Sequence, residues 1–291
     1  MADFVERWWE VDGLRLHARD YAGAAGDARA PVVCLHGLTR NARDFEDLAP
    51  WIAARGRRVL ALDVRGRGRS AHDPQSYRYN PAVYAGDVIE LLQRLAISRA
   101  IFIGTSMGGL IMMTLAALRP DLIEAAVLND VGIRISNAGL ARIMASVSAE
   151  RPQVTTWDEA AAFAKQTNGL AFPNNAEADW NAFARRAFEP DGHGKLRLAY
   201  DPAIAEPIKA AAESGGAPPD LAPFFMALAN GRPSLLVHGE LSDVLDAATV
   251  AEMRLLAPGM DDAPVSGVGH APTLMEPAAL AAIGKLLHET S

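Results

Sequence analysis

The stretch AIFIGTSMGG, residues 100–109, carries the pattern that decides the fold. Four of its first five residues are apolar, and Ser106 then stands between two glycines at the spacing G-x-S-x-G. The apolar spacing predicts a strand over 101–104 and a helix over 107–118 on the two sides of this serine. A G-x-S-x-G turn between a strand and a helix presents the serine hydroxyl at the end of a sheet. We therefore predict that Ser106 is a nucleophile on a strained turn.

Short apolar runs and helical patterns alternate on both sides of this stretch. The runs at 31–35, 59–64 and 123–128 have the length and composition of strands buried on both faces of a parallel sheet. Helical spacing between the runs predicts crossover units, and hence an α/β fold in which helices cover both faces of the sheet. Before them, residues 4–21 are expected to form a hairpin around a central Asp-Gly turn.

A long helical segment interrupts this alternation. Residues 133–231 are rich in alanine, have helical spacing and carry recurring aromatic side chains, but they show no strand pattern. Strand and helix patterns return from residue 234 onward. We therefore predict one α/β core, made of residues 1–132 and 232–291, with a helical cap or lid inserted at 133–231.

Composition limits the kinds of partner. Half of the 291 residues are hydrophobic and the net charge is −7, with no dominant basic face, which argues against nucleic acid or an anionic membrane as a partner. Cys34 is the single cysteine and lies in an apolar run, so a buried thiol and no intrachain disulfide are expected. Neither a signal-peptide pattern nor a membrane-spanning run stands out, so a cytoplasmic protein with a small-molecule substrate is expected. The oligomeric state is left open.

His270 is the predicted general base. A serine hydroxyl is a weak nucleophile until a base removes its proton. His270 lies in the run GVGHAP, residues 267–272, after the last expected strand, and its glycine neighbours allow the loop to bend toward a cleft. His36, in LHGL at 35–38, is expected to brace its own loop instead.

Two carboxylates are candidates for the acid that orients the base. Asp243 follows the expected strand near residue 234, and Asp130 follows the expected strand at 123–128. The chain order serine, aspartate, histidine holds for both. Asp243 is preferred, with Asp130 as the alternative, and the unused aspartate is expected to brace a loop or line the hinge of the cap.

Two backbone amides are predicted to hold the oxyanion. The amide of Met107 stands at the start of a helix, where the helix dipole also favours negative charge. The amide of Leu38 lies in the loop after the strand at 31–35, at the same carboxyl edge of the sheet.

These motifs together resemble the α/β-hydrolase superfamily over nearly the whole chain. The resemblance implies an eight-stranded, mostly parallel sheet with a helical cap inserted after the sixth strand. A serine in the nucleophile position sets aside the haloalkane dehalogenases and epoxide hydrolases, which use aspartate there. Ala271 counts against the carbon–carbon hydrolases, which often carry Trp after the catalytic histidine. The matching segments are HG at 36–37, LDVRGRGRS at 62–70, GTSMGG at 104–109, GELSD at 239–243 and GH at 269–270.

The expected function is that of a serine hydrolase. Such an enzyme would cleave a carboxylic ester or lactone of a small, fairly apolar molecule through an acyl-enzyme. No metal-ligand spacing is present, and no cofactor is expected. One alternative is hydrolysis of a carbon–carbon bond in a diketone-like substrate by the same three residues. Another is a non-catalytic receptor that keeps the pocket on a hydrolase scaffold.

Overall fold

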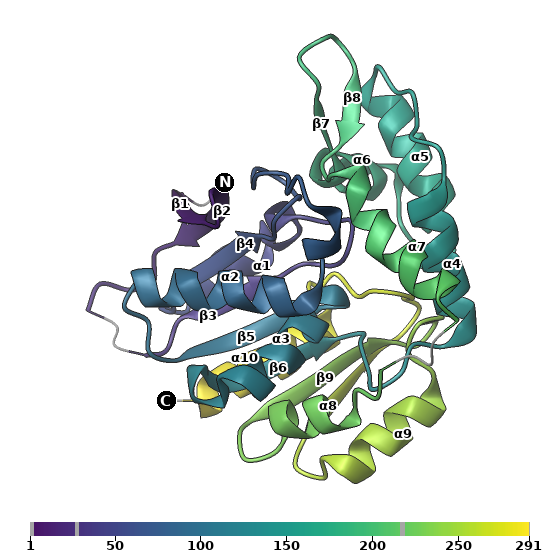
Figure 1. The fold of residues 1–291 in the computed structure, drawn as a ribbon. Helices are drawn as coiled ribbons and strands as arrows, with labels where there is room; N and C mark the ends of the chain where they lie inside the picture. Colours follow the sequence, from purple (N-terminus) through teal and green to yellow (C-terminus); the bar gives the residue numbers. More distant parts are fainter. Residues whose placement is uncertain (1–2, 27–28, 216–218, 291) are drawn as a thin grey trace.

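The computed structural model describes residues 3–26, 29–215 and 219–290. An eight-stranded sheet forms its centre, and Figure 1 shows helices on both sides of this sheet. The strand order is β1-β2-β4-β3-β5-β6-β9-β10. Every neighbouring pair is parallel except the two that involve β2, so the expectation of a mostly parallel sheet is confirmed. The strands are β1 (Val5–Val11), β2 (Leu14–Tyr21), β3 (Val32–Leu35), β4 (Val59–Asp63), β5 (Ala100–Thr105), β6 (Ile123–Asn129), β9 (Ser234–Gly239) and β10 (Asp261–Val265).

Helices cover both faces of the sheet, because the central strands bury side chains on both sides. Along β3, Val33 and Leu35 belong to one hydrophobic cluster, while Val32 and Cys34 belong to the other. The first face is covered by α2 (Pro81–Arg94), α3 (Met107–Leu118), α8 (Ala222–Ala229) and α9 (Ala247–Leu256). The second face is covered by α1 (Leu48–Ala53) and α10 (Pro277–Glu289).

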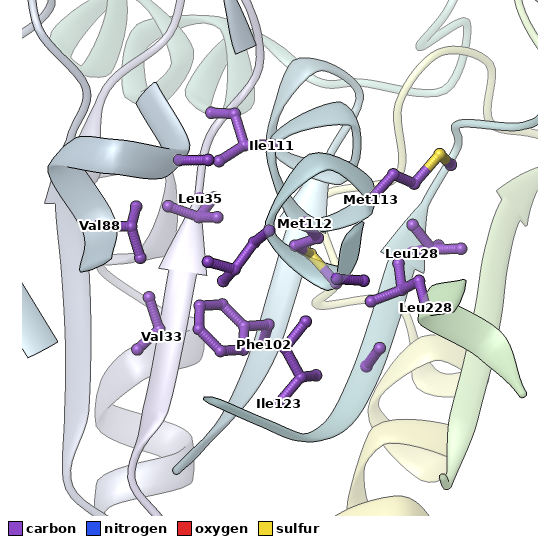
Figure 2. Packing of buried hydrophobic residues seen from close by; sticks show 14 of the residues in the cluster. Val33, Leu35, Val88, Phe102, Ile111, Met112, Met113, Ile123, Leu128 and Leu228 are labelled. Atoms are coloured by element: carbon purple, nitrogen blue, oxygen red, sulfur yellow. The ribbon is translucent and has the colours of Figure 1, made fainter. Parts of the chain in front are cut away.

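The helix α3 packs closely on the middle of the sheet. Figure 2 shows Ile111 and Met112 of this helix above Leu35 of β3 and Phe102 of β5, with Leu228 of α8 nearby. All five side chains are fully buried. This contact fixes the start of α3 relative to the carboxyl end of β5, which is where Ser106 lies.

The insertion forms a layer at one end of the sheet (Figure 1). It has its own buried cluster, which includes Phe172, Trp180 and Phe188. The structure differs from the sequence-based expectation because the insertion contains a short antiparallel hairpin, whose three-residue strands are too short to show a period of two. The elements are α4 (Asn137–Ser148), α5 (Trp157–Asn168), α6 (Glu177–Ala187), β7 (Phe188–Pro190), β8 (Leu196–Leu198) and α7 (Ala205–Glu213).

The last helix of the expected cap does not belong to this layer. Phe225 and Leu228 of α8 are buried in the cluster on the first face of the sheet, together with side chains of α3. α8 lies within the range 133–231 predicted for the cap, but its buried apolar side chains pack on the core rather than on the other helices of the insertion.

The insertion is joined to the core next to the strand ends. The Asn41 side chain donates a hydrogen bond to the Arg186 carbonyl of α6 (2.7 Å). The Gly269 amide donates to the Ala171 carbonyl of the insertion (2.6 Å). The loop that carries His270 is thus in direct contact with the insertion. Among the described residues, no helix has both the length and the apolar character to cross a membrane.

Candidate active site

Ser106 lies on a sharp turn between β5 and α3. Its φ is +51° and its ψ is −112°, in a region that L-residues rarely adopt. Glycine is required on both sides of it, because a Cβ on Gly104 would lie 2.3 Å from Met112 Sδ and one on Gly108 would lie 2.1 Å from the Leu35 carbonyl oxygen. The turn therefore depends on α3 lying directly on the sheet, and it has the shape expected for a nucleophile elbow.

Three side chains from separate loops meet at this turn. Ser106 Oγ is 3.0 Å from His270 Nε2, and His270 Nδ1 is 2.6 Å from Asp130 Oδ2. A carboxylate can only accept at Nδ1, so Nδ1 carries the proton and Nε2 is free to accept the serine hydroxyl proton. The arrangement can therefore activate Ser106 for attack on a carbonyl carbon.

Asp130 is held rigidly in its position. It is fully buried, immediately after β6, with φ of +53°. Its Oδ1 accepts a hydrogen bond from the Gly239 amide (2.9 Å), and its Oδ2 accepts one from the Ser242 hydroxyl (2.6 Å) as well as facing His270. These donors stabilise the ionised carboxylate in a buried place.

Asp243 is placed differently from the expectation. Its carboxylate pairs with Arg142 of α4, with 2.8 Å between Arg142 Nη2 and Asp243 Oδ1 and a second bond from Nε. The hydrogen bond from Arg142 lowers the pKa of Asp243 below its usual value. The preference for Asp243 over Asp130 is therefore corrected, because the loop after β9 contacts Asp130 through Ser242 while Asp243 turns toward α4 of the insertion.

Two backbone amides near Ser106 have no internal acceptor. Within the described residues, the N–H groups of Leu38 and Met107 donate no hydrogen bond. Leu38 lies in the loop after β3. Leu35, the last residue of β3, is paired with Gly104 of β5, so this loop runs beside Ser106. Free amides at such a place can hold a developing oxyanion.

Arg67 connects the two residues that carry these amides. Its side chain is fully buried. Nε donates to the Leu38 carbonyl (3.0 Å), Nη2 lies 3.4 Å from Met107 Sδ, and Nη1 donates to the Tyr84 hydroxyl (2.8 Å). From the sequence alone, only packing and ion pairing are expected of Arg67. Its position in a glycine-spaced run beyond a buried strand is the feature that could have indicated a place next to the site.

His36 braces its loop, as expected. It is fully buried, Nδ1 donates to the Gly37 carbonyl (2.7 Å), and Nε2 accepts from the Val64 amide (3.0 Å). Burial lowers the pKa of His36 to about 4, so the ring is neutral at pH 7. This neutral ring fixes the loop that carries Leu38.

A cavity of about 190 Å³ opens over Ser106 and His270. One wall comes from the core and the other from the insertion, including α4. Among the described residues, no group of three or more His, Cys, Asp or Glu side chains is placed to hold a metal ion. The lining combines apolar with charged side chains and includes Leu38, Phe45, Phe172, Phe183, Arg40 and Arg142.

The chain is similar to known proteins in both sequence and structure. A family model described as alpha/beta hydrolase fold matches residues 30–272. A 3-hydroxybutyrate-oligomer hydrolase from Cupriavidus necator is 34% identical over 261 residues, covering 88% of each chain. A 2-(acetamidomethylene)succinate hydrolase from Mesorhizobium japonicum is 27% identical over 267 residues, covering 92% of this chain and 89% of that protein. A crystal structure of an alpha/beta hydrolase from Novosphingobium aromaticivorans superposes with a TM-score of 0.91 at 44% identity, covering 99% of each chain.

Proposed function

Because this chain belongs to the alpha/beta-hydrolase family, we propose that it is a serine hydrolase that cleaves a carboxylic ester of a small molecule through an acyl-enzyme. The observation that carries the proposal is the continuous contact from Ser106 Oγ through His270 to the buried Asp130. A nucleophile, a base and a residue that orients the base are the parts that acyl transfer needs.

The first half of the proposed reaction forms the acyl-enzyme. Ser106 Oγ attacks the ester carbonyl carbon while its proton passes to His270 Nε2. The carbonyl oxygen becomes an oxyanion, held by the amides of Leu38 and Met107. His270 then gives the proton to the leaving alkoxide as the carbon–oxygen bond breaks. Asp130 keeps the ring oriented and stabilises the imidazolium.

The second half of the proposed reaction releases the acid. A water molecule gives its proton to His270 Nε2 and attacks the acyl carbonyl, which forms a second oxyanion at the same two amides. When this intermediate collapses, the proton returns to Ser106 Oγ and the carboxylic acid leaves. The chain needs no further group for either half, because water is the only other reactant.

An ester is the favoured substrate class, with a lactone treated as a cyclic ester. The 34% identical relative is named for hydrolysis of 3-hydroxybutyrate oligomers, which are chains of short esters. The cavity of about 190 Å³ suits a short substrate, and its Phe45, Phe172 and Phe183 side chains suit an apolar portion of it. We also propose that the insertion acts as a cap that supplies part of this wall.

An activity panel tests the proposal. The purified protein is assayed on p-nitrophenyl esters of graded acyl length, on lactones and on a vinylogous diketone, beside Ser106→Ala. We expect turnover of short esters that the substitution abolishes. Turnover of the diketone alone would favour carbon–carbon hydrolysis, and no turnover together with no reaction of Ser106 with a fluorophosphonate would favour a non-catalytic receptor.

A further inference from the structure

Three arginines line the cavity over Ser106, although the chain as a whole carries a net charge of −7. They are Arg40, Arg142 and Arg186, and Asp44 is the single carboxylate among the described residues of the same lining. The cavity wall is therefore more basic than the rest of the molecule. A wall of this kind is unexpected for a substrate that is apolar throughout.

Two of these guanidinium groups are occupied by the core. Arg40 binds Asp44 through both Nε and Nη2, and its guanidinium lies 4.0 Å from the ring centre of Phe183. Arg186 binds Glu46 and Asp47, with 2.8 Å between Arg186 Nε and Glu46 Oε1. Both arginine side chains are 18% exposed. Both arginines therefore join the segment after β3 to α6 of the insertion.

Arg142 differs from the other two arginines because one edge of its guanidinium is free. Nε and Nη2 bind Asp243, while Nη1 has no hydrogen-bond partner among the described residues. The side chain is 39% exposed. A guanidinium has five N–H donors, so Nη1 and Nη2 can together donate two hydrogen bonds to a second carboxylate.

The helix that carries Arg142 is anchored against the core. The Ser136 side chain caps α4 by accepting from the Gly139 amide (3.0 Å), and it also donates to the Asp243 carbonyl. A Cβ on Gly139 would lie 2.6 Å from that same carbonyl oxygen, so α4 touches the loop directly. Arg142, one turn further on, therefore has a fixed position at the cavity.

We propose that Arg142 is a subsite for a carboxylate of the substrate, with Asp243 as the resident counter-ion that orients its guanidinium. The inference rests on the proposed ester hydrolysis at Ser106. The substrate class is an ester that also bears a carboxylate. It is either a half-ester of a short dicarboxylic acid or a short hydroxy acid that is esterified at its hydroxyl group. The carboxylate binds the free edge of Arg142, and the ester carbonyl lies at Ser106.

Asp243 affects how strongly Arg142 attracts a second carboxylate. It holds the guanidinium in place, but its negative charge also weakens the attraction of Arg142 for a second anion. Loss of Arg142 and loss of the Asp243 charge must therefore change the preference for an anionic substrate in opposite directions. If the pair served only to tie the cap to the core, the two substitutions would act alike.

Two matched pairs of esters measure this preference. The first pair is mono-4-nitrophenyl glutarate and its methyl ester, which place the carboxylate or its neutral form on the acyl side. The second pair is 3-butyryloxybutyrate and its methyl ester, methyl 3-butyryloxybutyrate. In this pair the carboxylate, or its neutral form, lies on the alcohol side of the ester that is cleaved. The readout is the ratio of kcat/KM for the anionic ester to that for the neutral ester, in wild type, Arg142→Gln, Asp243→Asn and Arg186→Gln.

We expect a ratio above one for at least one pair. Arg142→Gln lowers that ratio about 10- to 100-fold, the effect of losing a charge-assisted pair. Asp243→Asn raises the ratio, and Arg186→Gln leaves it near the wild-type value. Using a ratio cancels any general loss of activity from a disturbed cap.

The inference is overturned if neither pair shows an anionic preference, or if Arg142→Gln and Asp243→Asn move the ratio in the same direction. In either case Ser106-dependent turnover of the neutral ester would leave the proposed hydrolysis standing. If neither the neutral nor the anionic ester is turned over, the proposed hydrolysis fails and the carboxylate subsite fails with it.

Discussion

Asp130 lies where three loops can reach one carboxylate. Thr105 is paired with Asn129, and Asn129 with Val237, so the residues that follow β5, β6 and β9 meet at one edge of the sheet. Asp130 is the residue directly after β6, and its two oxygens are both satisfied. Asp243 stands four residues after β9, far enough along the chain to turn to the cap.

Asp130→Asn should reduce kcat for a neutral ester by about 10⁴-fold, because the amide cannot hold the protonated Nδ1 of His270 in the required tautomer. Asp243→Asn should reduce it far less, since that carboxylate accepts no hydrogen bond from His270. Steady-state kinetics on a short p-nitrophenyl ester measures both. A larger loss from Asp243→Asn than from Asp130→Asn would return the role to Asp243.

We expect Arg67 to position the two amides, because its side chain contacts both Leu38 and Met107. Replacing it by lysine keeps the charge but loses the fork that reaches Leu38, Tyr84 and Met107 together. We expect Arg67→Lys to lower kcat by up to about 10²-fold, the effect of weakening one oxyanion donor, with little change in KM.

The measurement for Arg67→Lys is the split between kcat and KM, taken well below the melting temperature of the variant. A merely structural arginine would lower the melting temperature and leave kcat intact in the folded fraction. That result would contradict a positioning role.

Neutral His36 makes stability depend on pH. Its pKa is about 4 in the folded protein, against about 6.5 in an unfolded chain, so between these values the unfolded state binds more protons. Stability is therefore complete above about pH 6.5 and falls as the pH drops toward 4. Between pH 7 and pH 5, His36 should account for a loss of about 2 kcal/mol.

The test compares urea unfolding of wild type and His36→Asn at these two pH values. The difference in unfolding free energy between the two proteins should shrink by about that amount at pH 5. Carboxylates that titrate in the same range are common to both proteins and cancel. A difference that stays constant with pH would show that His36 is not held neutral.

At the scale of elements, the elbow between β5 and α3 depends on the absence of a side chain at Gly108. Gly108→Ala would place a methyl group 2.1 Å from the Leu35 carbonyl oxygen, so α3 must shift away from β3. We expect a destabilisation of about 1–3 kcal/mol and a clear loss of kcat, because Ser106 is the N-cap residue of the same helix.

Gly86 in α2 is the matched control for this substitution. It is exposed, and a Cβ there would have nothing within 4 Å. Gly86→Ala should therefore stabilise the protein by about 0.5–1 kcal/mol through helix propensity, with kcat unchanged. Thermal unfolding of both variants measures the contrast, and a similar effect of both would contradict a packing role for Gly108.

Sequence predicted the elements of the core well, because strands such as β3, β4 and β5 are short continuous apolar runs between helical patterns. It missed β7 and β8, whose pairing is local and only three residues long. It also misplaced α8, because an apolar helix near a boundary packs equally well on a cap or on a sheet, and only the tertiary contact with α3 decides between them.

At the scale of the whole molecule, the strand order explains why the proximity of Ser106 and His270 could be predicted while the carboxylate that contacts His270 could not. Any loop that follows a parallel strand begins at the carboxyl edge, so Asp130, directly after β6, and Asp243, four residues after β9, were both candidates. Whether the loop after β9 presents Ser242 or Asp243 to the site depends on its backbone path and on the contact of Asp243 with Arg142 of α4. The sequence pattern reveals neither the path nor the contact.

Labelling with a fluorophosphonate, followed by peptide mass spectrometry, tests the central claim that His270 activates Ser106 for nucleophilic attack. We expect one adduct, on Ser106, that forms rapidly in wild type, is absent in Ser106→Ala and forms much more slowly in His270→Gln. An adduct on another residue, or labelling of Ser106 that does not depend on His270, would contradict it.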